Sequence, residues 1–118
     1  MWFEIGTTED LKNATQAICR YLEENDVPKE KVFDCRLVVN ELVANALRHS
    51  DGKASVKGNI TDGRIEVFVR STQVFIPPTV SVCSPATAEG GRGLYLVDSV
   101  SISRTVSPDG EIKVVIQY

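Results

Sequence analysis

Apolar residues recur at helical spacing along two stretches in the first half of the chain. In residues 11–22 they stand three or four apart, behind a Thr7 and Asp10 pair that is typical of a capping box. A longer stripe starts just after Pro28 and ends before Ser50–Gly52. Its members are Val32, Cys35, Val39, Leu42 and Ala46. Their spacings of three and four predict a second helix with one continuous buried face.

The remaining apolar positions alternate with polar ones, which predicts strands. A short strand is expected at Trp2–Ile5. Burial of Trp2 and Phe3 in the core is the favoured interpretation, and a protein interface is the alternative. Residues 54–60 and 65–70 flank an Asp-Gly hairpin turn, and residues 101–106 and 112–118 flank a second turn. We therefore expect an α/β two-layer sandwich, with helices on one face of a mixed but mostly antiparallel sheet.

The segment at residues 71–90 has no clear periodicity and contains Pro77, Pro78 and Pro85. A structureless stretch of this length is unusual in a compact domain. It is either a functional lid or an element that the pattern does not reveal. Gly90–Gly93 then open a short helical pattern over Leu94–Ser99.

Composition narrows the class of protein. The chain has 118 residues, 42% of them hydrophobic, and a net charge of −3, which predicts a single globular domain over residues 1–118. The acidic balance disfavours direct nucleic-acid binding. No apolar run suits a membrane span or a secretory signal. Three dispersed cysteines and one histidine disfavour a structural zinc site, and we expect reduced thiols and a cytoplasmic location.

Glu41 and Asn45 are the first candidates for chemistry. They lie four apart and so share one side of the predicted helix, each directly before a residue of the buried stripe. A carboxylate at the edge of a core can act as a general base, and an amide oxygen can ligate Mg²⁺. The alternative is that both are ordinary polar residues on a solvated flank.

The glycine-rich run Gly90–Gly93 is the second candidate. Glycines allow backbone N–H groups to approach a phosphate, and the start of a helix favours anions. Arg92 can add a bidentate contact. The run lacks the spacing of the common dinucleotide and P-loop motifs, so a simple turn before a helix is the alternative.

Together the two candidates carry a family resemblance. VVNELVANALRHS at residues 38–50 resembles the N-box of the GHKL ATPases, which include histidine kinases, and GGRGLYLVDSV at residues 90–100 resembles their phosphate-binding G2 box. The spacing and length are most similar to the anti-sigma-factor serine/threonine kinases of the SpoIIAB and RsbW type. The resemblance spans nearly the whole chain and implies the Bergerat-type ATP-binding fold.

Carried over by position, the resemblance gives each candidate a role. Glu41 matches the catalytic carboxylate and Asn45 the Mg²⁺ ligand. Gly91 and Gly93, with Arg92 between them, match the loop that wraps the triphosphate, and the preceding segment matches the ATP lid. The cofactors implied are ATP and Mg²⁺. The partners implied are a sigma factor and an anti-anti-sigma protein phosphorylated on serine, and a homodimer fits the family.

One motif of the family is missing. The G1 motif, Asp-x-Gly-x-Gly, should follow the second hairpin strand, but Ser71, Gln73 and Phe75 stand at its three positions. Loss of a charged hydrogen bond to adenine costs about 1.5–3 kcal/mol, or roughly 10- to 100-fold in affinity. Ser71 can accept a weaker bond, directly or through water. Weak ATP binding, binding of another nucleotide and a dead site are the three outcomes.

Two functions therefore compete. The retained Glu41, Asn45 and G2 glycines favour an ATP-dependent regulatory serine/threonine kinase. The absent G1 motif favours a non-catalytic interaction module on the same fold. A metabolic hydrolase has little support, because no Ser-His-Asp or Cys-His arrangement is visible and His49 is the only histidine.

Overall fold

A computed structural model describes residues 2–48, 53–71, 89–108 and 110–118, with only the backbone described for residues 89–94. Five strands form one sheet in the order β1-β2-β3-β5-β4, and all four pairings are antiparallel. The strands are β1 (Phe3–Ile5), β2 (Ala54–Thr61), β3 (Arg64–Ser71), β4 (Ser103–Val106) and β5 (Ile112–Gln117).

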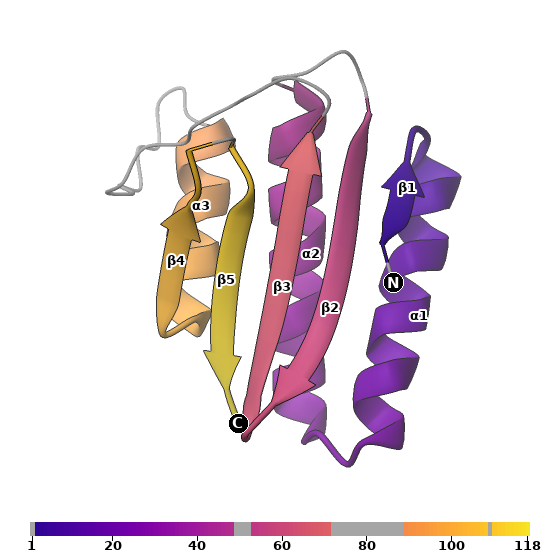
Figure 1. Ribbon diagram of the computed structural model, residues 1–118, viewed down its shortest axis with the longest axis vertical. Helices are drawn as coiled ribbons and strands as arrows, with labels where there is room; N and C mark the ends of the chain where they lie inside the picture. Colours follow the sequence, from indigo (N-terminus) through magenta and orange to yellow (C-terminus); the bar gives the residue numbers. More distant parts are fainter. Residues whose placement is uncertain (1, 49–52, 72–88, 109) are drawn as a thin grey trace.

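Three helices cover one face of this sheet, as Figure 1 shows. They are α1 (Thr8–Glu24), α2 (Lys29–Arg48) and α3 (Glu89–Val100). The middle helix, α2, packs against both of the others and against β2, β3 and β5. The predicted two-layer α/β sandwich is confirmed. Among the described residues, no helix is long and apolar enough to cross a membrane.

Local sequence signals set several of these boundaries. The Thr7 hydroxyl accepts from the Asp10 N–H at 3.1 Å, while the Asp10 carboxylate accepts from the Gly6 and Thr7 N–H groups at 3.0 and 3.1 Å. These bonds stabilise the carboxylate and lower the pKa of Asp10. The predicted capping box is confirmed. At α2, Pro28 stands directly before the first helical residue, and its carbonyl accepts from two N–H groups of the first turn.

The tight turn between β2 and β3 joins Thr61 to Arg64 through Asp62 and Gly63. Both turn residues have positive φ, 47° and 74°. Two-residue hairpins need this backbone because it matches the right-handed twist of the strands. The Asp-Gly pair predicted in this turn is therefore the reason that β2 and β3 pair in a single register along their full lengths.

The core lies between α2 and the inner face of the sheet. Cys35, Val39 and Leu42 on α2 are fully buried, as the helical stripe predicts, and they face Val67 and Val69 of β3 within one apolar cluster. On β2, a side chain at Gly58 would meet Ile18 of α1 at 3.0 Å, so glycine here allows α1 to lie close to the strand.

Three expectations need correction. The third helix begins at Glu89 and includes the glycines, whereas the pattern placed them in a turn before it. Strand β4 begins at Ser103, because the Ser101 hydroxyl still donates to the Val97 carbonyl of α3 at 2.7 Å. Phe3 packs against the core, but Trp2 lies on the opposite face of the sheet, beside Phe68.

Candidate functional site

The two flanks of α2 face different neighbours. Arg36 and Asn40 line a hollow together with α1 residues, so this flank faces α1. Counted from Asn40, Glu41 and Asn45 lie about 100° and 140° further round the helix, on the flank that faces α3. Since α3 packs against α2 and lies on the side away from α1 (Figure 1), the two predicted residues border the α2–α3 contact.

Asn45 is the more deeply placed of the pair. Its relative exposure is 3%, whereas Glu41 is half-buried. The Asn45 side-chain oxygen Oδ1 accepts a hydrogen bond from Nη2 of Arg48, one turn later, at 3.3 Å. The Asn45 nitrogen Nδ2 is buried and has no hydrogen-bond partner among the residues that the structure describes. Glu41 thus lies at the edge of the core, as expected, whereas Asn45 lies inside it.

An unpaired buried amide is costly. A buried donor without an acceptor costs about 1–3 kcal/mol, and most buried polar side chains have a partner. Asn45 is one of only two buried polar residues among those the structure describes, and the other, Thr15, donates to the Leu11 carbonyl at 2.8 Å. The Asn45 amide is thus the polar group in the described core that lacks a complete set of partners.

Several chain segments converge at the end of the molecule where α2 stops. Figure 1 shows the last turns of α2, the first turn of α3 and the end of β3 at the same end. Ser71 is the last residue of β3 and pairs with Ala54. It continues the inward-facing row of Val67 and Val69, so by register it faces the helical layer.

The backbone of Gly91, Arg92 and Gly93 lies in the first turns of α3. The first four N–H groups of a helix have no partner within it, and this end carries partial positive charge. An anion can therefore be held here by helix backbone rather than by a separate loop. The opposite end of α3 is fixed by Arg104 of β4, which bonds Asp98 at 2.8 and 3.2 Å.

The donor set suits Mg²⁺ that arrives with a nucleotide. The described residues contain no group of three or more His, Cys, Asp or Glu side chains that would hold a metal ion alone. Mg²⁺ takes one or two protein oxygens and fills its other positions with waters and phosphate oxygens. The Asn45 Oδ1 is one such oxygen. It becomes available when Arg48, which is exposed, releases it.

Some predicted features lie outside the described residues. They are Gln73 and Phe75, which stand at two positions of the G1 motif, the single histidine His49, the cysteine Cys83, and most of the segment assigned to the lid. Of the predicted site residues, Glu41, Asn45 and Ser71 are described with their side chains. Gly91, Arg92 and Gly93 are described as backbone only.

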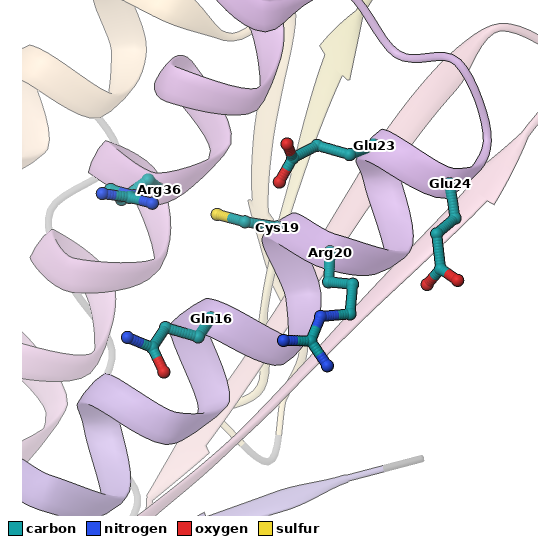
Figure 2. A pocket seen from close by; sticks show the side chains of 6 residues that line it. All are labelled: Gln16, Cys19, Arg20, Glu23, Glu24 and Arg36. Carbon is teal, nitrogen blue, oxygen red and sulfur yellow. The ribbon is translucent and has the colours of Figure 1, made fainter.

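A separate hollow of about 550 Å³ lies between α1 and α2. Figure 2 shows Arg36 entering it from α2, while Cys19 points from α1 toward α2. Its remaining lining residues are Gln16, Arg20, Glu23 and Glu24. Binding pockets are mostly apolar with a few convergent polar groups, and this polar lining of mixed charge is not of that kind. It lies on the flank of α2 away from Glu41 and Asn45.

The role of Arg48 is the feature that sequence reasoning missed. From the sequence alone, a cation near the C-terminal end of a helix serves only to complement the helix dipole. In the structure its guanidinium contacts the one amide oxygen predicted to ligate Mg²⁺. The spacing of three residues between Asn45 and Arg48 was a usable signal, because residues three apart on a helix are neighbours.

Comparison with known families places these features in context. Residues 6–116 match the histidine kinase-like ATPase domain. The matched range includes all three helices, strands β2, β3 and β4, and all of β5 except its last residue, whereas β1 lies before it. No curated protein matches the chain. Because the match covers nearly all of the sequence, the chain belongs to the histidine kinase-like ATPase domain family.

Proposed function

We propose that this protein binds Mg-ATP at the end of the α2–α3 contact and acts as a cytoplasmic serine/threonine kinase of the anti-sigma-factor type. Its substrate would be a serine of an anti-anti-sigma partner, and its second partner a sigma factor. The observation that carries the proposal is Asn45, a buried amide one turn from Glu41, whose nitrogen has no partner among the described atoms. A core that keeps such a costly group needs a ligand to complete its hydrogen bonds.

Each residue has a defined task in this proposal. The Asn45 amide holds the metal through Oδ1 and donates from Nδ2 to a phosphate oxygen. Free N–H groups in the first turn of α3, that of Gly91 among them, hold further phosphate oxygens, whereas Gly93 is the fifth helical residue and its N–H bonds within the helix. Arg92 adds charge beside them, and Ser71 accepts from the base. When bound, Mg²⁺ neutralises charge on the phosphate oxygens. Positioning and electrostatics provide most of the catalysis of phosphoryl transfer, which suits a site with few ionisable groups.

Glu41 supplies the acid–base chemistry. It takes the proton from the partner's serine hydroxyl while the serine oxygen forms a bond to the terminal phosphorus of ATP. The bond between that phosphorus and the bridging oxygen breaks, and ADP leaves with the electron pair. The products are phosphoserine and ADP, and the proton rests on the Glu41 carboxylate until water removes it.

Two observations favour a second candidate, a non-catalytic interaction module. Ser71 replaces the aspartate that the family uses for adenine, so nucleotide affinity falls by about 10- to 100-fold. Arg48 also donates to the Asn45 oxygen and competes with a metal there. On this reading, the protein would hold a sigma factor or its antagonist through its surface, as a monomer or as a homodimer.

Two single substitutions separate the candidates. Glu41→Gln should retain the stabilisation that Mg-ATP gives in a thermal melt but lose ATP turnover, because the amide cannot accept the proton. Asn45→Ala should lose both. A matched control is Asn40→Ala, which changes the same residue type on the opposite flank of α2 and should lose neither. The kinase proposal fails if Glu41→Gln turns over ATP at the rate of the unchanged protein.

A further inference from the structure

The outer face of the sheet carries an aromatic pair surrounded by cations. The ring centroids of Trp2 and Phe68 lie 6.4 Å apart, with the planes at 64°. Lys57 places its Nζ 5.1 Å from the Trp2 centroid and 4.7 Å from that of Phe68. The Arg70 guanidinium carbon lies 3.8 Å from the Trp2 centroid. We call Trp2, Lys57, Phe68 and Arg70 the aromatic–cation patch.

The patch lies on the face of the sheet that no helix covers. The helices pack on the opposite face (Figure 1), against the row that includes Val56, Val67 and Val69. Lys57 and Phe68 are direct cross-strand partners on β2 and β3. Each is adjacent in sequence to a residue of that inner row, so both lie on the outer face. The patch is therefore separated from Asn45 by the full thickness of the sheet.

The charge of the patch is not balanced by neighbours. Lys113 is paired with Glu66 at 3.0 Å, and Glu4 accepts from the Ser55 hydroxyl at 3.0 Å. Lys57 and Arg70, in contrast, have no carboxylate within ion-pair distance among the described residues. In a chain with a net charge of −3, this surface presents two positive groups without acidic partners.

Contact with the aromatic ring leaves the hydrogen-bond donors of these cations available to a carboxylate. A guanidinium that stacks on an indole uses its flat face, so the N–H donors along its edge stay free for a carboxylate. The contact also restricts the side chain, which reduces the entropy lost on binding. Arg70 and Lys57 both lie over the Trp2 ring, so one aromatic side chain holds two cationic donors.

We propose that the aromatic–cation patch is a docking surface for an acidic segment of a partner protein. Carboxylates of that segment pair with Arg70 and Lys57 beside the Trp2 ring. A nucleic acid fits less well, because nucleic-acid surfaces use extended basic stripes, whereas the patch holds two cations beside one indole ring. This surface is independent of the nucleotide site.

Trp2 provides a direct readout, since it is the only tryptophan in the chain. The probe is hexaglutamate, titrated at low ionic strength while tryptophan fluorescence is recorded, with calorimetry giving the affinity independently. We expect a saturable change that weakens as salt is added. The double variant Lys57→Gln/Arg70→Gln should bind about tenfold more weakly or not at all.

The control is Arg20→Gln/Arg36→Gln, which removes the same charge from the helical layer and should bind as the unchanged protein does. Both double variants should keep any stabilisation by Mg-ATP. The proposal is overturned if hexaglutamate gives no saturable change or if both double variants weaken binding equally. It is also overturned if oligothymidylate binds more tightly than hexaglutamate, or if Trp2 instead reports self-association that depends on protein concentration.

Discussion

Asn40 and Asn45 are the same residue on the same helix, but the fold treats them differently. On the flank facing α1, Asn40 is half-buried and its Nδ2 donates to the Arg36 carbonyl one turn earlier at 2.8 Å. On the flank facing α3, Asn45 is 3% exposed, and its Nδ2 has no partner in the described part of the chain. Asn40 is satisfied by its own helix. Asn45 needs a group from outside the described protein atoms.

This difference separates a structural polar residue from a functional one. A buried unpaired donor lowers stability, and functional sites are where such costs are commonly found. Residue type does not distinguish the two asparagines, and spacing places them only on opposite flanks of the same helix. The distinction comes from burial and from the hydrogen-bond partners. The comparison can be tested by changing residues on α2 one at a time.

The largest loss of stability should come from a substitution on the core side of α2, which lies between the flanks that carry the two asparagines. Leu42 is fully buried, so Leu42→Ala should lower the free energy of unfolding by about 2–5 kcal/mol. Leu37→Ala makes the same chemical change at a half-buried position of α2 and should cost clearly less. Urea unfolding of both variants checks this. Equal losses would mean that Leu42 does not anchor α2 to the sheet.

The next largest effect should be a loss of stability at alkaline pH, caused by a residue on the same side of α2. Burial, reinforced by Cys19 and Asp34, raises the pKa of the Cys35 thiol from 9.0 to about 12. The unfolded thiol ionises first as the pH rises, so the stabilisation is complete below about pH 9. It then falls by about 1.4 kcal/mol per pH unit up to about pH 12.

Urea unfolding at a series of alkaline pH values measures this slope. Cys35→Ala is the control, because it removes the titrating thiol and should flatten the curve relative to the unchanged protein. Identical slopes in the two proteins would contradict the burial of a neutral thiol at this position.

The smallest expected change is in the free energy of unfolding on replacing either asparagine by alanine, and its sign should differ between the two. Without nucleotide, Asn40→Ala loses a satisfied hydrogen bond and should lower the free energy of unfolding by about 1 kcal/mol. Asn45→Ala removes an unpaired buried donor, together with one weak bond from exposed Arg48, and should leave stability unchanged or raise it by about 1 kcal/mol. Thermal melts of both variants test this. A large loss of stability in Asn45→Ala would mean that Asn45 has a structural role.

The sequence predicted those parts of the fold where a local signal and the tertiary structure agree. The capping box at Thr7 and Asp10, the turn at Asp62–Gly63 and the stripe through Leu42 each have a local cause. The early start of α3 was missed because glycine has a low helix propensity, and packing of α3 against α2 outweighs it. The orientation of Trp2 could not be read from two adjacent aromatic residues; the pairing of Phe3 with Val56 sets it.

The candidate site was predictable to a similar extent. Spacing placed Glu41 and Asn45 on one flank, and the family resemblance gave them roles. Neither could show that the Asn45 nitrogen lacks a partner or that Arg48 contacts its oxygen, because both depend on how α2 packs against its neighbours. The aromatic–cation patch was also hidden, since its members come from three separate strand regions that only the sheet register brings together.

Calorimetric titration with Mg-ATP tests the central claim most directly, using the unchanged protein, Asn45→Ala and Asn40→Ala. If the buried Asn45 amide is part of a nucleotide site, the unchanged protein and Asn40→Ala bind Mg-ATP equally at one site. Asn45→Ala then shows no saturable heat. If none of the three binds, or if Asn45→Ala binds as tightly as Asn40→Ala, Asn45 does not mark a nucleotide site.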